Sequence, residues 1–126
     1  MRAIDTNVLV RLIARDEAAQ TASAEAAVAK GAWVSHLVLA ETVWVLASAY
    51  GLSAKQIALA VEMLLNHAQI TIQDADVVSR ALGHHRAHPK VELSDCLVLE
   101  IACKHGHAPL STFDRRFSEI DGVERI

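Results

Sequence analysis

Apolar and polar residues along this chain follow two spacings, one typical of strands and one typical of helices. Short apolar runs predict strands at residues 2–4, 32–35, 68–73, 108–111 and 122–126. Longer segments with helical spacing predict helices at residues 8–15, 16–31, 36–51, 54–67, 74–88 and 93–106, with a short helix within 112–120. Because strands alternate with helices, the pattern predicts an α/β fold with a parallel sheet and helices on both of its faces.

Glycine and capping signals support several of these boundaries. The Ala-rich second helix ends at Lys30 and Gly31, and Ser53 stands where the N-cap of a later helix is expected. Two successive helices carry more apolar surface than a small domain needs. These side chains therefore belong either to the core or to a surface that contacts a partner protein and a second copy of the chain. They are Val38, Trp44, Ile57, Val61, Leu64 and Leu65.

Composition indicates one well-packed domain covering residues 1–126. Hydrophobic residues make up 52% of the 126 residues and aromatic residues only 4%, so aliphatic side chains must fill the core. The net charge of −3 argues against nucleic-acid binding through a broad basic face, but not against an enzyme that meets phosphate through metal ions. No apolar run approaches the roughly 18 residues of a membrane helix, and the N-terminus does not read as a signal peptide. We therefore expect a cytoplasmic protein with no membrane association, in which Cys96 and Cys103 are reduced thiols.

Two acidic residues follow predicted strands, where open parallel sheets bind their ligands. Asp5 comes directly after the first strand, and Asp114 comes shortly after the strand at 108–111. Each also has a simple structural explanation, because Asp5 or Asn7 could cap the first helix and Asp114 could begin a turn.

Two further acids lie in helices. Every neighbour of Glu41 at helical spacing is apolar, so Glu41 is either an acid at the edge of an apolar face, with its carboxylate in water, or a buried charge that needs a cation. Asp95 lies in the first turn of its helix, where an acid is favoured, and Glu92 lies three residues before it. If the four acids converge, their repulsion requires divalent cations, and all-oxygen ligation suits Mg²⁺ or Mn²⁺.

Four stretches of the chain together resemble the PIN-domain ribonucleases, and most of all their VapC-type branch, the toxin half of type II toxin–antitoxin pairs. The stretches are IDTNVLVRLI, AETVWVL, LSDCLVLEIA and STFDRRF, which occur in the family's order and with similar spacing. None of them is specific alone, but together they span nearly the whole chain. The resemblance implies a three-layer α/β/α sandwich with a five-stranded, mostly parallel central sheet.

By this resemblance, Asp5, Glu41, Asp95 and Asp114 are the catalytic, metal-binding acids, and the metal is Mg²⁺ or Mn²⁺. Side chains that would support them by hydrogen bonding are Thr6, Asn7, Ser111 and Thr112, with Glu92 as a weaker candidate where relatives often carry another acid. The sequence shows no departure from the family at the four main acids.

Basic side chains are weaker candidates for contact with RNA phosphates. They are Arg11 and Arg15 on the first helix, Arg86 and Lys90 near a histidine-rich loop, and Arg115 and Arg116 after the last acid. Solvated helix faces explain the same residues equally well. In HHRAHPK, His84 and His88 have the spacing of a zinc pair, but no acid or Cys lies near in sequence, so a solvated loop containing His84, His85 and His88 is favoured.

The function predicted from the sequence is a metal-dependent endoribonuclease that hydrolyses RNA phosphodiester bonds to 5′-phosphate and 3′-hydroxyl ends. The resemblance also implies a cognate antitoxin protein and a homodimer. One alternative is another Mg²⁺-dependent α/β phosphohydrolase, such as an aspartyl-phosphate phosphatase. That class would need a second Asp two residues after Asp5, where this chain has Asn7. The other alternative is a non-catalytic PIN-like binding module, which the intact set of four acids disfavours.

Overall fold

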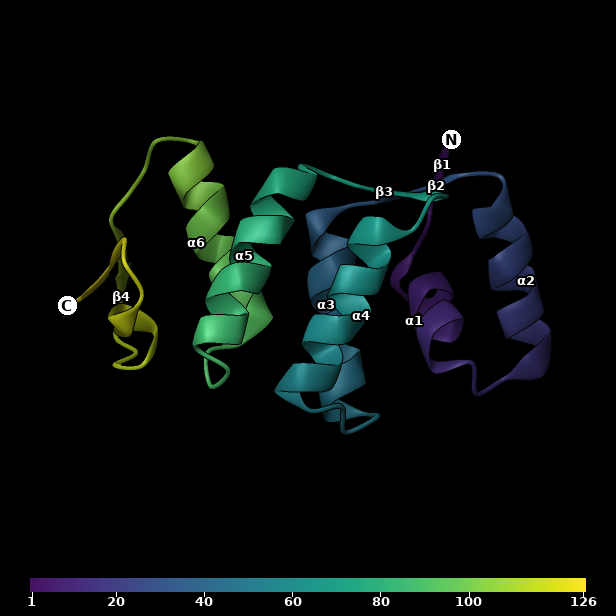
Figure 1. The fold of residues 1–126 in the computed structure, drawn as a ribbon, viewed down its shortest axis with the longest axis horizontal. Helices are drawn as coiled ribbons and strands as arrows, with labels where there is room; N and C mark the ends of the chain where they lie inside the picture. Colours follow the sequence, from purple (N-terminus) through teal and green to yellow (C-terminus); the bar gives the residue numbers. More distant parts are fainter. The chain divides into compact units, whose positions relative to one another are not determined.

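The computed structural model describes residues 1–126 as six α-helices, five short β-strands and one 3-10 helix (Figure 1). In chain order the elements are β1 Arg2–Ala3, α1 Thr6–Ala14, α2 Ala18–Ala29, β2 Ala32–Val34, α3 His36–Ser48, α4 Ala54–Asn66, β3 Ile70–Ile72, α5 Ala75–Ala87, α6 Leu93–Lys104, β4 Leu110–Thr112, η1 Phe117–Glu119 and β5 Val123–Arg125. They form two compact units, Met1–Ala75 and Asp76–Ile126. No helix is long and apolar enough to cross a membrane.

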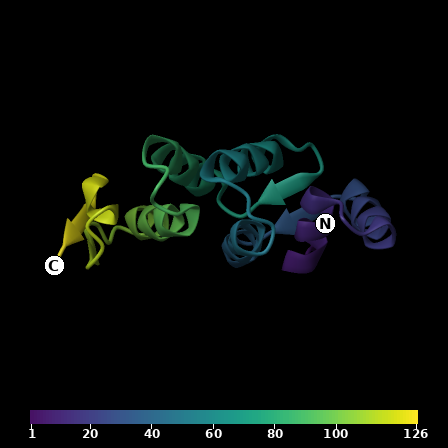
Figure 2. The same cartoon turned by 90° about the horizontal axis from the view of Figure 1, so that it is seen from below.

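The first unit is built on a three-stranded parallel sheet with the strand order β1-β2-β3. Ala32 in the central strand is fully buried and pairs with Arg2 on one side and Ile70 on the other. Helix α1 packs against α2 and α3, and α4 packs against β3 and α3. Helices α3 and α4 run side by side in both views (Figure 1, Figure 2). The core between these helices and the sheet is aliphatic, as the composition predicts.

The second unit combines the helices α5 and α6 with a parallel pair of strands, β4 and β5. Lys104 at the end of α6 forms an ion pair with Asp76 at the start of α5, at 3.2 Å. Near the other end of α5, His84 Nε2 lies 3.0 Å from Glu100 Oε1 on α6. The two helices are therefore antiparallel, and polar contacts join them near both ends of α5.

The structure confirms the predicted α/β fold, and all of its strand pairings are parallel. Its five strands are arranged as one sheet of three and one sheet of two. That these sheets belong to a single five-stranded sheet, and that residues 1–126 form a single domain, stay predictions.

The helix boundaries agree closely with the sequence pattern. Ser53 caps α4 through a complete capping box with Gln56, in which each side chain bonds the other residue's backbone N–H. The first helix begins at Thr6, two residues earlier than predicted, because Asp5 is its N-cap. The first strand is correspondingly short.

The apolar faces of α3 and α4 divide between core and surface. Three of the predicted apolar side chains are buried in the core of the first unit, which confirms the core interpretation for them: Ile57, Val61 and Leu64. Trp44 is different, since 66% of its surface is exposed.

Candidate functional site

Asp5 lies directly after the buried Ile4 and begins helix α1. Its Oδ1 accepts a hydrogen bond of 2.7 Å from the backbone N–H of Thr6. Asp5 therefore caps helix α1, which is the structural role considered for it. The bond orients the exposed carboxylate and leaves its second oxygen, Oδ2, for another ligand, so capping and metal binding are compatible.

Glu41 lies on α3 and is linked to the start of α1. The Thr6 hydroxyl, which is buried, donates a hydrogen bond of 3.4 Å to Glu41 Oε2. Glu41 itself is exposed, so its carboxylate does not carry the large desolvation cost of a buried charge. Thr6 thus connects two of the predicted acids, because it follows Asp5 and contacts Glu41. Asn7, the next residue of α1, is exposed.

Asp95 is the third residue of α6 and is partly buried. Burial raises the pKa of its carboxyl group, and the negative charges of Glu92 and Asp114 raise it further. Glu92 occupies the N-cap position of α6 but its side chain makes no capping bond. The second unit therefore brings three carboxylates within electrostatic reach of one another.

Asp114 lies in the turn after β4. Its Oδ1 accepts hydrogen bonds from the backbone N–H groups of Arg116 at 2.9 Å and Phe117 at 3.2 Å. The hydroxyl of Thr112 accepts one of 3.0 Å from the backbone N–H of Asp114. Asp114 therefore begins a turn, which is the structural role considered for it, and the Thr112 side chain supports this turn. That Thr112 supports a metal-binding acid stays a prediction. Ser111 is exposed on β4.

The four predicted metal ligands are shared between the units, with Asp5 and Glu41 in the first and Asp95 and Asp114 in the second. Within each unit, no group of three or more His, Cys, Asp or Glu side chains is arranged to hold a metal ion. The convergence of the two pairs stays a prediction.

The basic residues of α1 have partners in the first unit. Arg11 bonds Gln20 at 2.6 Å, Tyr50 at 2.9 Å and Asp16 at 3.3 Å. Arg15 forms an ion pair with Glu25. These contacts tie α1 to its neighbours, so both side chains have structural roles beside the predicted one in RNA binding.

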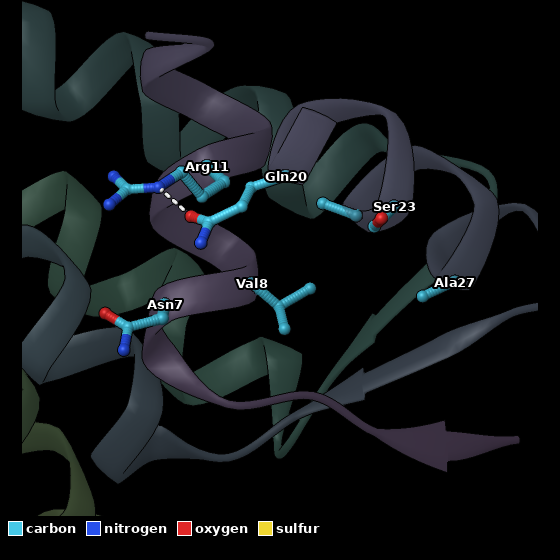
Figure 3. Close-up of a pocket in the computed structure, with 7 residues that line it drawn as sticks. Asn7, Val8, Arg11, Gln20, Ser23 and Ala27 are labelled. Carbon is cyan, nitrogen blue, oxygen red and sulfur yellow. Dashed lines mark hydrogen bonds between the residues drawn. The ribbon is translucent and has the colours of Figure 1, made fainter. Parts of the chain in front are cut away.

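A pocket of about 260 Å³ lies between α1 and α2 (Figure 3). Its walls are mostly apolar and include Val8 and Ala24, and the hydrogen bond between Arg11 and Gln20 lies along it. No pattern in the sequence indicates this pocket, because its lining comes from two helices that pack together only in the folded protein.

The prediction of a solvated loop at the histidine-rich segment is wrong for His84 and His85, because both lie on α5 and His85 is buried. His84 contacts Glu100, which is buried on α6, and the ring Nδ1 of the buried His85 lies 2.7 Å from the carbonyl oxygen of Val91. Sequence reasoning missed Glu100 as a partner because it is 16 residues away. The signal was present, since Glu100 has Cys96 and Leu97 as its helical neighbours on a buried face.

The chain is an α/β protein that carries Asp5 and Asp95 at helix starts, Asp114 after a strand and Glu41 within α3. Residues 3–123 match the family described as PIN domain, and the chain belongs to this family. No curated protein and no solved structure matches the chain. PIN domains are generally nucleases that use divalent metals, so the chain has a nuclease-type fold.

Proposed function

We propose that this protein is a Mg²⁺- or Mn²⁺-dependent endoribonuclease and acts as the toxin of a toxin–antitoxin pair. The observation that supports the proposal is that each of the four stretches resembling a PIN domain carries an acid. Two of these acids are linked through Thr6, and two are close enough to interact electrostatically. All-oxygen donors of this kind suit Mg²⁺ or Mn²⁺ better than zinc.

The electrostatics of the second unit fit a cation. The pKa of Asp95 is raised by burial and by the charges of two other carboxylates, so negative charge gathers around this side chain. A bound divalent ion would lower the pKa of an attacking water and offset the charge that develops on the phosphate oxygens.

The chain's own residues would position these carboxylates. Thr6 orients Glu41, and its backbone N–H orients Asp5. The backbone N–H groups at the start of η1 orient Asp114. In the proposed reaction, water attacks phosphorus and the 3′-oxygen leaves, so the products carry 5′-phosphate and 3′-hydroxyl ends.

Cleavage of an end-labelled single-stranded RNA tests the proposal. We expect cleavage with Mg²⁺ or Mn²⁺, loss of cleavage with EDTA, and recovery when excess metal is added. Glu41→Gln should be inactive, whereas Glu25→Gln, which removes an exposed acid on α2, should cleave as the wild type does. RNA that stays intact at every metal concentration would contradict the proposal and favour a non-catalytic PIN-like module.

We also propose a homodimer and a cognate antitoxin as protein partners. Exposed apolar side chains on adjacent helices support this, with Leu37 and Trp44 on α3 and Leu59 and Met63 on α4. Exposed apolar surface of this kind is typical of protein interfaces. Light scattering of the purified chain tests self-association, and a monomer at high micromolar concentration would contradict the homodimer.

A further inference from the structure

A second pocket, of about 380 Å³, lies within the second unit. One wall is the loop between α5 and α6, which contributes His88 and Lys90. The other wall is formed by η1 and the residue before it, which contribute Glu119 and Arg116. The sequence offered Lys90 and Arg116 only as members of two separate basic pairs, and the pocket joins one residue from each pair.

The pocket has the charge of an anion site. Lys90 and Arg116 are both exposed, and neither takes part in an ion pair in the structure. His88 adds a ring that can donate a hydrogen bond. Glu119 is the single acid of the lining, so cationic groups outnumber it. A planar guanidinium and an ammonium group are the side chains that most often bind phosphate oxygens.

Both walls are held by hydrogen bonds. In the loop, the backbone N–H of Val91 donates to the carbonyl of His88 at 2.9 Å, and the ring of His85 contacts the carbonyl of Val91 at 2.7 Å. On the other side, the backbone N–H of Arg116 donates to Asp114 Oδ1 at 2.9 Å. A pocket with walls fixed in this way loses little conformational freedom when it binds a ligand.

The same two walls carry candidate acids. Glu92 directly follows Val91, and Asp114 precedes Arg116 by two residues. The charges of Glu92 and Asp114 both act on Asp95, so these acids and the pocket share one part of the second unit. A phosphate bound in the pocket would therefore lie beside the acids proposed to act on a neighbouring phosphodiester.

We propose that this pocket binds a backbone phosphate of the RNA strand other than the one that is cleaved, with Lys90 and Arg116 as its positioning residues. The inference rests on the proposed function, since it assigns the substrate of that function a second point of attachment. The volume falls in the range of roughly 300–1,000 Å³ for small-molecule sites, which leaves room for a phosphate and its sugar.

The test measures binding of a fluorescein-labelled single-stranded RNA in EDTA, where no cleavage is expected, over a series of salt concentrations. Lys90→Gln and Arg116→Gln should each weaken binding at low salt. The logarithm of the binding constant decreases linearly with the logarithm of the salt concentration. In the double variant this decrease should be shallower by about 0.7, the value for one phosphate contact on a single strand. A matched double variant, Lys30→Gln with Arg80→Gln, removes two exposed cations outside the pocket and should keep the wild-type slope.

A variant that is expected to bind RNA more tightly shows that weaker binding in the other variants is not caused by loss of folding. Glu119→Gln removes the acid of the pocket and should tighten RNA binding. Three outcomes would overturn the proposal: no binding by the wild type at the lowest salt, equal slopes for the two double variants, or a fall of about 1.4, which indicates two separate phosphates. Failure of the proposed function would look different, because pocket-dependent RNA binding would remain while Mg²⁺ produced no cleavage.

Discussion

The hydroxyl of Thr6 donates a hydrogen bond to the carboxylate of Glu41, and this contact joins the first turn of α1 to the middle of α3. At 3.4 Å the bond is long for an O–H···O contact, so its contribution to stability is small. Its geometric effect is larger, because Thr6 also bonds Asp5 through its backbone. One residue thereby sets the directions of two predicted metal ligands.

Replacing this hydroxyl should separate stability from activity. In Thr6→Val we expect the free energy of unfolding to change by less than about 1 kcal/mol, while Mn²⁺-dependent RNA cleavage falls because Glu41 is no longer oriented. Thr6→Ser keeps a hydroxyl and should keep most of the activity. Urea unfolding and cleavage assays on the same preparations provide the measurement. Wild-type cleavage by Thr6→Val would show that the contact has no role in positioning.

The exposure of Glu41 changes what its substitution should do. A buried charge would make Glu41→Gln more stable without metal, but the exposed carboxylate leaves the metal-free stability within about 0.5 kcal/mol of the wild type. Addition of Mn²⁺ should raise the melting temperature of the wild type, since the ion binds only the folded protein, and should raise that of the variant less. Melting curves over a Mn²⁺ series measure both effects. An equal rise of the melting temperature with Mn²⁺ in the two proteins would show that Glu41 is not a metal ligand.

Asp95 should make stability depend on pH in metal-free protein. Because its pKa is raised above 3.8 by burial and by neighbouring charges, the unfolded chain loses this proton at lower pH than the folded chain. Stability therefore falls as the pH rises from about 3.8 through the raised pKa, and the cost persists at neutral pH. Asp95→Asn should be more stable than the wild type at pH 7 in EDTA, and this advantage should shrink toward acidic pH.

Urea unfolding of both proteins across this pH range checks the expectation. Asp76→Asn is a useful control of opposite sign, because the hydrogen bond from Lys104 lowers the pKa of Asp76. A wild type as stable as Asp95→Asn at neutral pH would mean that the charges of the three carboxylates are already compensated.

Local signals in the sequence predicted most of the elements, and packing explains what they could not predict. Ser53, Gly31 and Gly51 mark helix ends by backbone chemistry that depends only on neighbouring residues. By contrast, Trp44 and Ile57 both belong to apolar helix faces, yet one is exposed and the other is core. Their difference arises from which face of each helix packs against the core, since α3 also buries Leu39 and Leu46, and no local pattern encodes this.

The candidate site shows the same division. The sequence found Asp5 and Asp114 because each follows a strand, and it correctly offered helix capping as a role for Asp5 and the start of a turn as a role for Asp114. It could not find the contact between Thr6 and Glu41, which are 35 residues apart, or the pocket that joins Lys90 to Arg116. Those features need tertiary structure, and they are the ones that suggest how the acids and the substrate are positioned.

The two cysteines of α6 should differ sharply in reactivity. Burial raises the pKa of the Cys96 thiol to about 12, with further contributions from the charges of Asp95 and Glu100. Only on the order of one Cys96 thiol in ten thousand is therefore ionised at pH 8, whereas Cys103 is exposed at the other end of the helix.

Iodoacetamide should modify Cys103 quickly and Cys96 only when α6 opens. Mass spectrometry of the intact protein measures this as a single fast addition, and Cys103→Ser should abolish it. Mn²⁺ bound at Asp95 would stabilise the closed state of α6, so it should slow the second addition, which requires this helix to open. Rapid modification of both thiols in the folded protein would contradict the packing of α6, and a second addition indifferent to Mn²⁺ would count against Asp95 as a ligand.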